Sequence, residues 1–133
     1  MMYMLDTNIC IYAIKHNPKK VLINLNKHDP SEICISSITY AELMYGVEKS
    51  KAIDRNRIAL SLFLANIQIL DFDDCASECY GIIRAQLEKQ GTPIGPLDTM
   101  IAAHAKSLDC TLVTNNTKEF KRIKKLKLDN WTK

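Results

Sequence analysis

The chain has 133 residues, 47% of them hydrophobic and 25% charged, which is the composition of an ordinary soluble globular protein. Its length suits a single domain over 1–133 and allows a core without disulfides or structural metals. Five cysteines without a C-x-x-C pair argue against a disulfide framework and a thiolate zinc site, so we expect each to pack as a small apolar side chain. The net charge of +3 is too small to identify a partner.

Short apolar runs alternate with segments of helical periodicity along the chain. The run Met2–Leu5 predicts a buried strand that ends at Asp6, and Thr7 or Asn8 could cap the helix that follows. The expected strands cover 2–5, 33–35, 67–70 and 111–113, and the expected helices cover 9–15, 18–27, 39–49, 54–66, 73–91 and 96–108, with a short basic helix from 117 and an edge strand near 131. This alternation predicts an α/β fold with a mostly parallel central sheet flanked by helices.

Three acids are predicted to reach one edge of this sheet. Asp6 directly follows a buried strand, and open α/β sheets bind their ligands at the carboxyl ends of the strands. Glu42 lies three residues after Thr39, at the spacing of a capping box in the first turn of a helix. Asp98 lies in the first turn of the helix that Pro96 is expected to begin. Each acid alone could serve only as a helix cap or a dipole partner, but together they favour a carboxylate cleft.

Uncompensated carboxylates in one cleft repel each other and raise one another's pKa. A hard divalent cation removes that cost, and Mg²⁺ prefers one or two carboxylates together with water. Such a cation can stabilise charge on a phosphoryl oxygen and assist attack by water. An acid cluster of this kind therefore points to phosphodiester hydrolysis.

Four short motifs strengthen this interpretation because they occur in order along nearly the whole chain. They are L-D-T-N at 5–8, I-S-S-x-T-x-A-E-L at 35–43, I-G-x-x-D-x-x-I-A-A at 94–103 and L-V-T-N-N-T-K-E-F at 112–120. Together they resemble the PIN-domain ribonuclease toxins, and most closely the VapC toxins of bacterial type II toxin–antitoxin systems. The resemblance implies a compact PIN-like α/β/α sandwich and metal-dependent hydrolysis of RNA.

The resemblance also assigns roles to individual residues. Asp6 and Asp98 would be the main ligands of Mg²⁺, for which Mn²⁺ is a possible substitute. Glu42 would be the third acid and would hold the attacking water. Thr7 and Asn8 would orient Asp6.

The fourth motif departs from the family pattern. Thr114 matches the family and could support the site through its hydroxyl, but many PIN domains carry a fourth acid shortly after this position. Here Asn115 and Asn116 fill the stretch, and Asn116 brings hydrogen bonds without charge. Glu119 could replace the missing acid, or it could be only a first-turn residue of the last helix.

The resemblance further implies a set of partners. It predicts an RNA substrate, with tRNA and the anticodon loop of initiator tRNA as candidates, and a separately encoded VapB-like antitoxin. The antitoxin would dock on apolar residues of the early helices, and the toxin would contact promoter DNA only through it. The toxin would also form a homodimer. Because the chain shows no secretory signal and no apolar stretch of about 18 residues, we expect a cytoplasmic protein without membrane contact.

Two rival functions remain open at this point. Without a fourth acid, the chain could be a catalytically weak PIN-fold module that binds RNA or protein. A phosphotransfer enzyme of the haloacid-dehalogenase kind also has an aspartate after its first strand, but it uses D-x-D where this chain has Asp6-Thr7-Asn8.

Two further features of the sequence have open interpretations. The segment Lys118–Lys127 holds six basic residues and one acid, and it is either a solvated face or a surface that contacts phosphates. His104 falls on an apolar helix face and is expected to be packed in the core, whereas His16 and His28 lie in polar stretches and are expected to be exposed.

Overall fold

The computed structural model describes all residues, 1–133, and contains one sheet of five parallel strands. The strands are β1 (Tyr3–Leu5), β2 (Ile33–Ser36), β3 (Gln68–Leu70), β4 (Thr111–Val113) and β5 (Lys127–Asp129). Their order across the sheet is β3-β2-β1-β4-β5, and every neighbouring pair is parallel. The predicted α/β class is confirmed, including the edge strand near the C-terminus.

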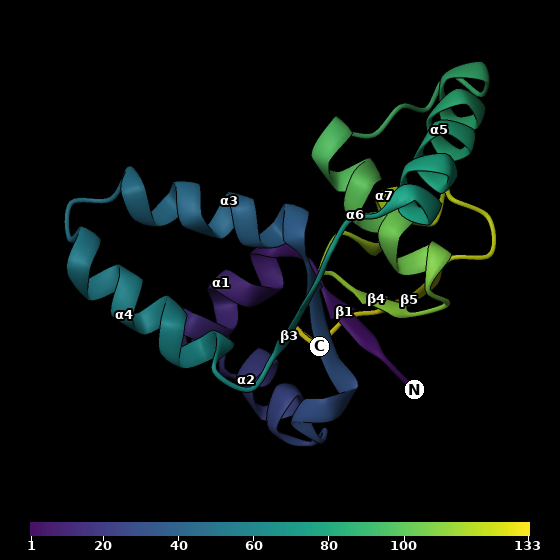
Figure 1. Ribbon diagram of the computed structural model, residues 1–133. Coiled ribbons are helices and arrows are strands. Elements are labelled where there is room, and N and C mark those ends of the chain that lie inside the picture. The colour runs from purple at the N-terminus through teal and green to yellow at the C-terminus, as the bar shows by residue number, and fades with distance from the viewer.

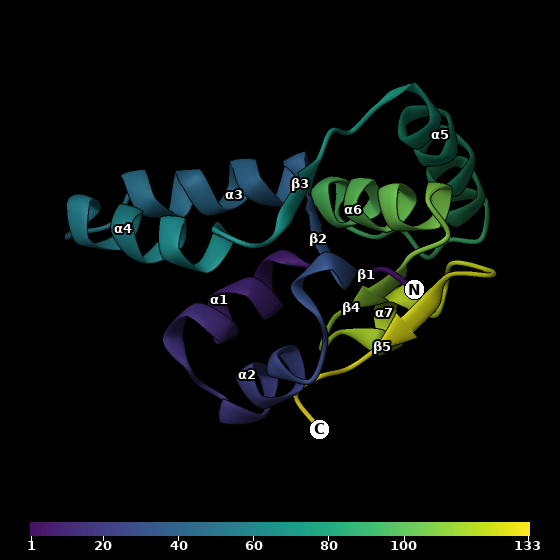
Figure 2. The ribbon, with the colours of Figure 1, turned by 60° about the horizontal axis from the view of Figure 1, so that its bottom comes forward.

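Seven helices and one 3₁₀ turn connect the strands and cover both faces of the sheet (Figures 1 and 2). They are α1 (Thr7–Lys15), α2 (Lys19–Asn26), η1 (Pro30–Glu32), α3 (Ser37–Glu48), α4 (Ile53–Leu64), α5 (Asp74–Lys89), α6 (Pro96–Ser107) and α7 (Thr117–Phe120). Helices α3 and α4 form a hairpin that projects away from the sheet (Figure 1). No helix is both long enough and apolar enough to cross a bilayer.

The alternation of side chains along the strands creates two separate cores. Met4 and Leu112 point to one face, where they pack with α5 and α6. Their neighbours Leu5 and Val113 point to the other face, where they pack with the helices α1 to α4. Because both of their faces are covered, the central strands β1, β2 and β4 are short, mostly buried runs that the sequence located well, whereas the edge strands β3 and β5 are largely exposed.

The strand order places a topological switch point between β1 and β4. From β1 the chain adds β2 and β3 on one side, and it then crosses back to add β4 and β5 on the other. In open α/β sheets the crevice at the carboxyl ends of such a strand pair is the usual ligand site. The backbone N–H of Asp6 donates to the carbonyl of Val113 at 3.0 Å, which fixes the ends of β1 and β4 to each other.

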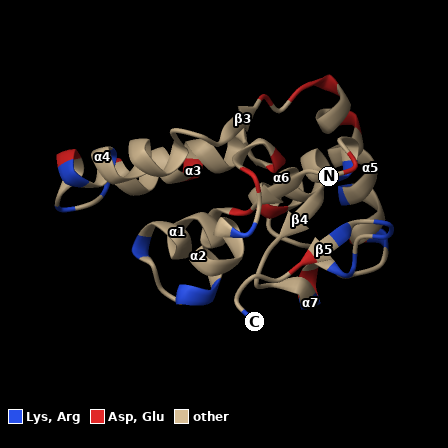
Figure 3. Cartoon of the chain, turned by 90° about the horizontal axis from the view of Figure 1, so that it is seen from below, with Lys and Arg blue, Asp and Glu red and all other residues tan.

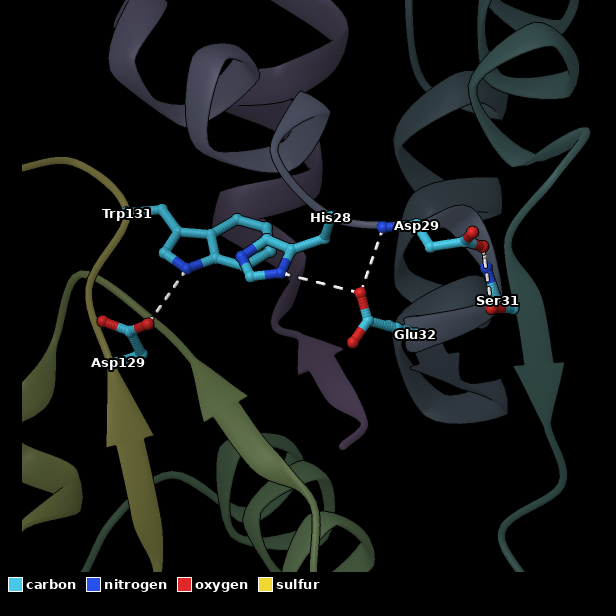
Figure 4. Close-up of polar contacts among 6 residues, drawn as sticks. All are labelled: His28, Asp29, Ser31, Glu32, Asp129 and Trp131. Carbon is cyan, nitrogen blue, oxygen red and sulfur yellow. Dashed lines mark hydrogen bonds and ion pairs between the residues drawn. The ribbon is translucent and has the colours of Figure 1, made fainter.

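The C-terminal segment is fastened to the N-terminal half by an aromatic contact (Figure 4). The Trp131 ring stacks on His28 with centroids 5.1 Å apart, and its Nε1 donates to Asp129 at 3.1 Å. His28 Nδ1 also lies 3.9 Å from Glu32 Oε1. The His28 side chain is only 24% exposed, so the expectation that it is exposed is wrong. The ring is half-buried because the tail after β5 folds over it, a long-range contact with no local signal.

The cysteines do not all behave as predicted. Cys10, Cys34 and Cys110 are buried, and all five thiols are free. Cys75, however, is exposed in the first turn of α5, and Cys79 is only partly buried. These two lie on an amphipathic helix that buries only one side, so residue type alone was a poor guide there.

Candidate active site

Asp6 lies at the switch point and has two roles. It is the N-cap of α1, because its carboxylate accepts the backbone N–H of Ile9 at 3.0 Å. The hydroxyl of Thr114, just past β4, donates to the same carboxylate. Thr7 and Asn8 do not hold Asp6 as predicted: the Thr7 hydroxyl bonds elsewhere, and Asn8 is exposed without a bond to Asp6.

The charge of Asp6 is poorly compensated in this position. Its side chain is only 5% exposed, and burial raises its pKa from the ordinary 3.8 to about 6. Hydrogen bonds from Thr114 and Ile9 oppose this rise, while the negative charges of Asp98 and Glu42 add to it. The carboxyl group therefore lies close enough to two other acids to be affected by their charge.

Glu42 reaches the cluster from the second turn of α3. The Thr7 hydroxyl donates to Glu42 Oε1 at 2.5 Å, so Thr7 positions Glu42 rather than Asp6. The prediction that Thr39 caps this helix is wrong, because the N-cap is Ser36, whose hydroxyl accepts the N–H of Ile38 at 3.1 Å. Ser36, Ser37 and Thr39 are all able to cap a helix. The helix begins directly after the buried strand β2, so its last residue, Ser36, is the cap.

Asp98 enters from the first turn of α6, where Pro96 is the first helical residue as predicted. It is half-buried, and burial raises its pKa, as do the nearby charges of Glu42 and Glu119. Asp98 is therefore within electrostatic reach of the acids on α3 and α7.

Glu119 joins the cluster through Asn116. The side-chain amide of Asn116 donates to Glu119 Oε2 at 2.9 Å, and its backbone N–H donates to the Thr114 hydroxyl at 3.0 Å. The asparagine that stands near the family's fourth acid thus holds an acid from the next turn. The sequence left open whether Glu119 replaces the missing acid, and in the structure its charge raises the pKa of Asp98, so it lies within electrostatic range of the cluster.

The four acids form one negative patch without a basic partner. None of Asp6, Glu42, Asp98 and Glu119 takes part in an ion pair, although the chain has five such pairs elsewhere.

The donor set fits a hard divalent cation. All of its side-chain donors are carboxylate oxygens, and no three His, Cys, Asp or Glu side chains stand close enough to enclose an ion by themselves. A cation here would have one or two carboxylate ligands with water completing its shell, which is the arrangement that Mg²⁺ favours.

Comparisons with known proteins agree with this geometry. The family profile described as "PIN domain" matches residues 3–126. The chain is 46% identical to the "tRNA(fMet)-specific endonuclease VapC" of Shigella flexneri, over 98% of each chain. It is 49% identical to "Ribonuclease VapC2" of Rickettsia felis over the full length of both.

This chain belongs to the VapC family of PIN-domain ribonucleases. It is therefore an RNA-cleaving hydrolase, and the haloacid-dehalogenase alternative is excluded. Among solved structures, the Rickettsia felis VapBC2 complex bound to a fragment of its promoter DNA superposes with a TM-score of 0.92. That match has 47% identity and covers 98% of this chain and 99% of the other.

A buried hydrogen bond ties together the two VapC helices that carry Glu42 and Asp98. His104 Nδ1 on α6 lies 2.8 Å from the hydroxyl of Ser36, the N-cap of α3. Burial lowers the pKa of His104, against the charges of Asp73 and Asp71, so the neutral ring can accept the Ser36 proton. The prediction that His104 is a core histidine is confirmed, but its bond to Ser36 was missed. The position of Ser36 between a buried strand and a helix could have indicated that it is the cap.

Replacing Ser36 with Ala is expected to lower the free energy of unfolding by about 1–3 kcal/mol, because Ile38 loses its cap and His104 loses its partner. Urea unfolding measures the change. Ser61→Ala, at an exposed α4 position without a side-chain hydrogen bond, is the control and should stay within about 0.5 kcal/mol of the unsubstituted chain. Equal unfolding midpoints for the two variants would show that the Ser36 bonds contribute nothing.

Proposed function

We propose that this chain is a Mg²⁺-dependent endoribonuclease toxin of a type II toxin–antitoxin module, with tRNA as its substrate class and initiator tRNA as the first candidate. The observation that carries the proposal is the cluster of four unpaired carboxylates at the β1/β4 switch point. The name of the Shigella flexneri relative supports the choice of substrate. In this proposal residues 1–133 act as a single PIN domain in the cytoplasm.

The proposed roles follow from what holds each acid. Asp6 and Asp98 would hold Mg²⁺, or Mn²⁺ in its place, since burial and mutual repulsion raise the pKa of both carboxyl groups and a cation would offset that cost. A bound cation of this kind supplies Lewis-acid stabilisation of the charge that develops on the phosphoryl oxygens.

Glu42 is the proposed acceptor of the proton from the attacking water. One of its carboxylate oxygens is occupied by the Thr7 hydroxyl, which leaves the other free for a water molecule. The water oxygen would form the new bond to phosphorus while the bond from phosphorus to the leaving ribose oxygen breaks. Glu119, held by Asn116 and near enough for its charge to raise the pKa of Asp98, would help to orient the water.

A VapB-like antitoxin is the proposed protein partner, as in the VapBC complexes that this chain resembles. An apolar hollow of about 300 Å³ between α1, α3 and α4 opens beside Glu42 and offers a site for it. Ile11 and Leu43, apolar residues of the early helices of the kind expected to receive the antitoxin, line this hollow. We further propose that the toxin forms a homodimer and meets promoter DNA only through the antitoxin.

Cleavage of a total tRNA pool by antitoxin-free protein tests this function. With Mg²⁺ we expect a discrete cut in one or a few tRNAs, and sequencing of the new ends identifies the substrate. EDTA and the Asp98→Asn substitution should each abolish the cut. Folded protein that leaves every tRNA intact across a range of Mg²⁺ and Mn²⁺ concentrations would instead support the binding-module alternative.

A further inference from the structure

The basic segment Lys118–Lys127 has no part in the proposed chemistry, although it begins inside the acid cluster. Glu119 belongs to this segment, and its charge raises the pKa of Asp98. The rest of the segment runs from α7 through a turn into β5, and Figure 3 shows Lys and Arg concentrated there. The segment therefore starts at the carboxyl edge of the sheet, near the acids, and leads to the amino edge, where Lys127 begins β5 and pairs with Asp109.

Most of these cations have no acidic partner. Lys127 pairs with Asp109 at 3.1 Å, and Arg122 donates to the backbone carbonyl of Pro93 at 3.3 Å. The other four are exposed and form no ion pair: Lys118, Lys121, Lys124 and Lys125. Four uncompensated positive charges on one short stretch of surface favour an anionic partner.

The segment is fixed in place rather than being a loose tail. Phe120 and Ile123 are 1% and 5% exposed, and both pack in the core beside β1 and β4. The bond from Arg122 to Pro93 joins the segment to the loop that leads into α6 and Asp98. Its lysines are therefore held outward at a constant position relative to the acids.

A polyanionic substrate needs such a surface because the acid cluster repels phosphates. Lys and Arg supply most of the sequence-independent affinity for nucleic acids, by releasing counterions from the phosphates they contact. We propose that Lys118, Lys121, Lys124 and Lys125 bind the sugar–phosphate backbone of the RNA as it leads away from the cleavage point along this side of the sheet. This inference rests on the proposed ribonuclease function and adds the surface by which the substrate is held.

The test is RNA binding by a variant with all four lysines changed to Gln. It uses the full chain in the Asp98→Asn background, which keeps the RNA uncut, and a total tRNA pool as the probe. The matched control carries four Lys→Gln changes at exposed, unpaired positions on the other side of the molecule: Lys19, Lys20, Lys27 and Lys51. Both variants lose the same net charge.

The quantity to compare is the slope of log K against log salt concentration. Each lost phosphate contact lowers the magnitude of that slope by about 0.7–0.9, so the four Lys→Gln changes in the basic segment should lower it by about 3. At about 0.1 M salt the same variant should bind at least about tenfold more weakly, and the control should change by less than about threefold. A variant with the same four lysines changed to Arg should bind like the unsubstituted chain, which separates loss of charge from loss of fold.

Three outcomes would overturn the proposal. The basic-segment variant and the control could lose affinity equally, the unsubstituted chain could fail to bind RNA, or the basic-segment variant could keep RNA affinity while losing binding to the antitoxin or to promoter DNA in complex with it. Failure of the ribonuclease function has a different signature. In that case RNA would bind through the lysines, but protein with Asp98 intact would not cut it at any Mg²⁺ concentration.

Discussion

Asp6→Asn is expected to lower the rate of RNA cleavage by at least about 10³-fold, because a neutral amide replaces the carboxylate that would hold the cation at the switch point. The substitution keeps the side chain's shape, and an amide oxygen can still cap α1 by accepting the Ile9 N–H. The loss should therefore appear in kcat for protein that remains folded. Asp54→Asn, at an exposed position on α4, is the matched control and should cleave RNA normally.

Without metal, the same substitution should make the protein more stable than the unsubstituted chain, with the full gain above about pH 6 and none below about pH 4. Burial raises the pKa of Asp6 from 3.8 to about 6, so its contribution to stability is complete below pH 3.8 and is lost as the pH rises through 6. At about 1.4 kcal/mol per pKa unit, the ionised carboxylate costs the fold up to about 3 kcal/mol above pH 6. Asn has no such charge to bury.

Urea unfolding in EDTA measures this difference. At pH 8 the Asp6→Asn variant should be more stable than the unsubstituted chain by up to about 3 kcal/mol, and the advantage should shrink steadily between pH 6 and pH 4. Saturating Mg²⁺ should stabilise the unsubstituted chain alone. The quantity to compare is the stability of the Asp6→Asn variant minus that of the unsubstituted chain. A smaller difference at pH 8 than at pH 4 would contradict the buried-charge account.

Glu42→Gln is expected to lower kcat by about 10²–10⁴-fold, the usual contribution of a positioned proton acceptor. Gln keeps the oxygen that accepts the Thr7 hydroxyl, so neither the fold nor the affinity for Mg²⁺ should change much. This separates Glu42 from Asp6, whose replacement should impair cation binding as well as rate. Cleavage of the identified tRNA under single-turnover conditions makes the measurement.

Thr7→Val provides the supporting comparison, because it leaves Glu42 intact but removes the hydrogen bond that orients it. It should give a smaller loss of kcat than Glu42→Gln, and Thr7→Ser should restore most of the rate. A Glu42→Gln variant that cleaves within about tenfold of the unsubstituted chain would remove Glu42 from the proton-transfer role.

Local sequence signals were sufficient to predict most of the fold. Buried strands such as Thr111–Val113 are short apolar runs between polar residues, and Pro96 marks a helix start by its fixed backbone geometry. Capping residues were harder to assign. Asp6 rather than Thr7 or Asn8 caps α1, and Ser36 rather than Thr39 caps α3. Several residues with capping ability stand together in both places, and the strand that precedes them decides which one is used.

The meeting of the acids could be predicted only in outline. The rule that parallel strands share one carboxyl edge brings Asp6 and Asp98 together without knowledge of side-chain contacts. The bonds that orient the acids depend on packing between elements far apart in sequence. Thr7 to Glu42 spans 35 residues, and it could not be read from spacing within one motif.

Direct binding of Mn²⁺ is the measurement that tests the central claim, that Asp6 and Asp98 hold a divalent cation at the β1/β4 switch point. The electron paramagnetic resonance signal of free Mn²⁺ reports binding to the unsubstituted chain and to the Asp6→Asn and Asp98→Asn variants, with Asp54→Asn as the control. We predict saturable binding, displaced by Mg²⁺, by the unsubstituted chain and the control, and an affinity at least about tenfold weaker in both site variants. Equal Mn²⁺ affinity in all four proteins would contradict the claim.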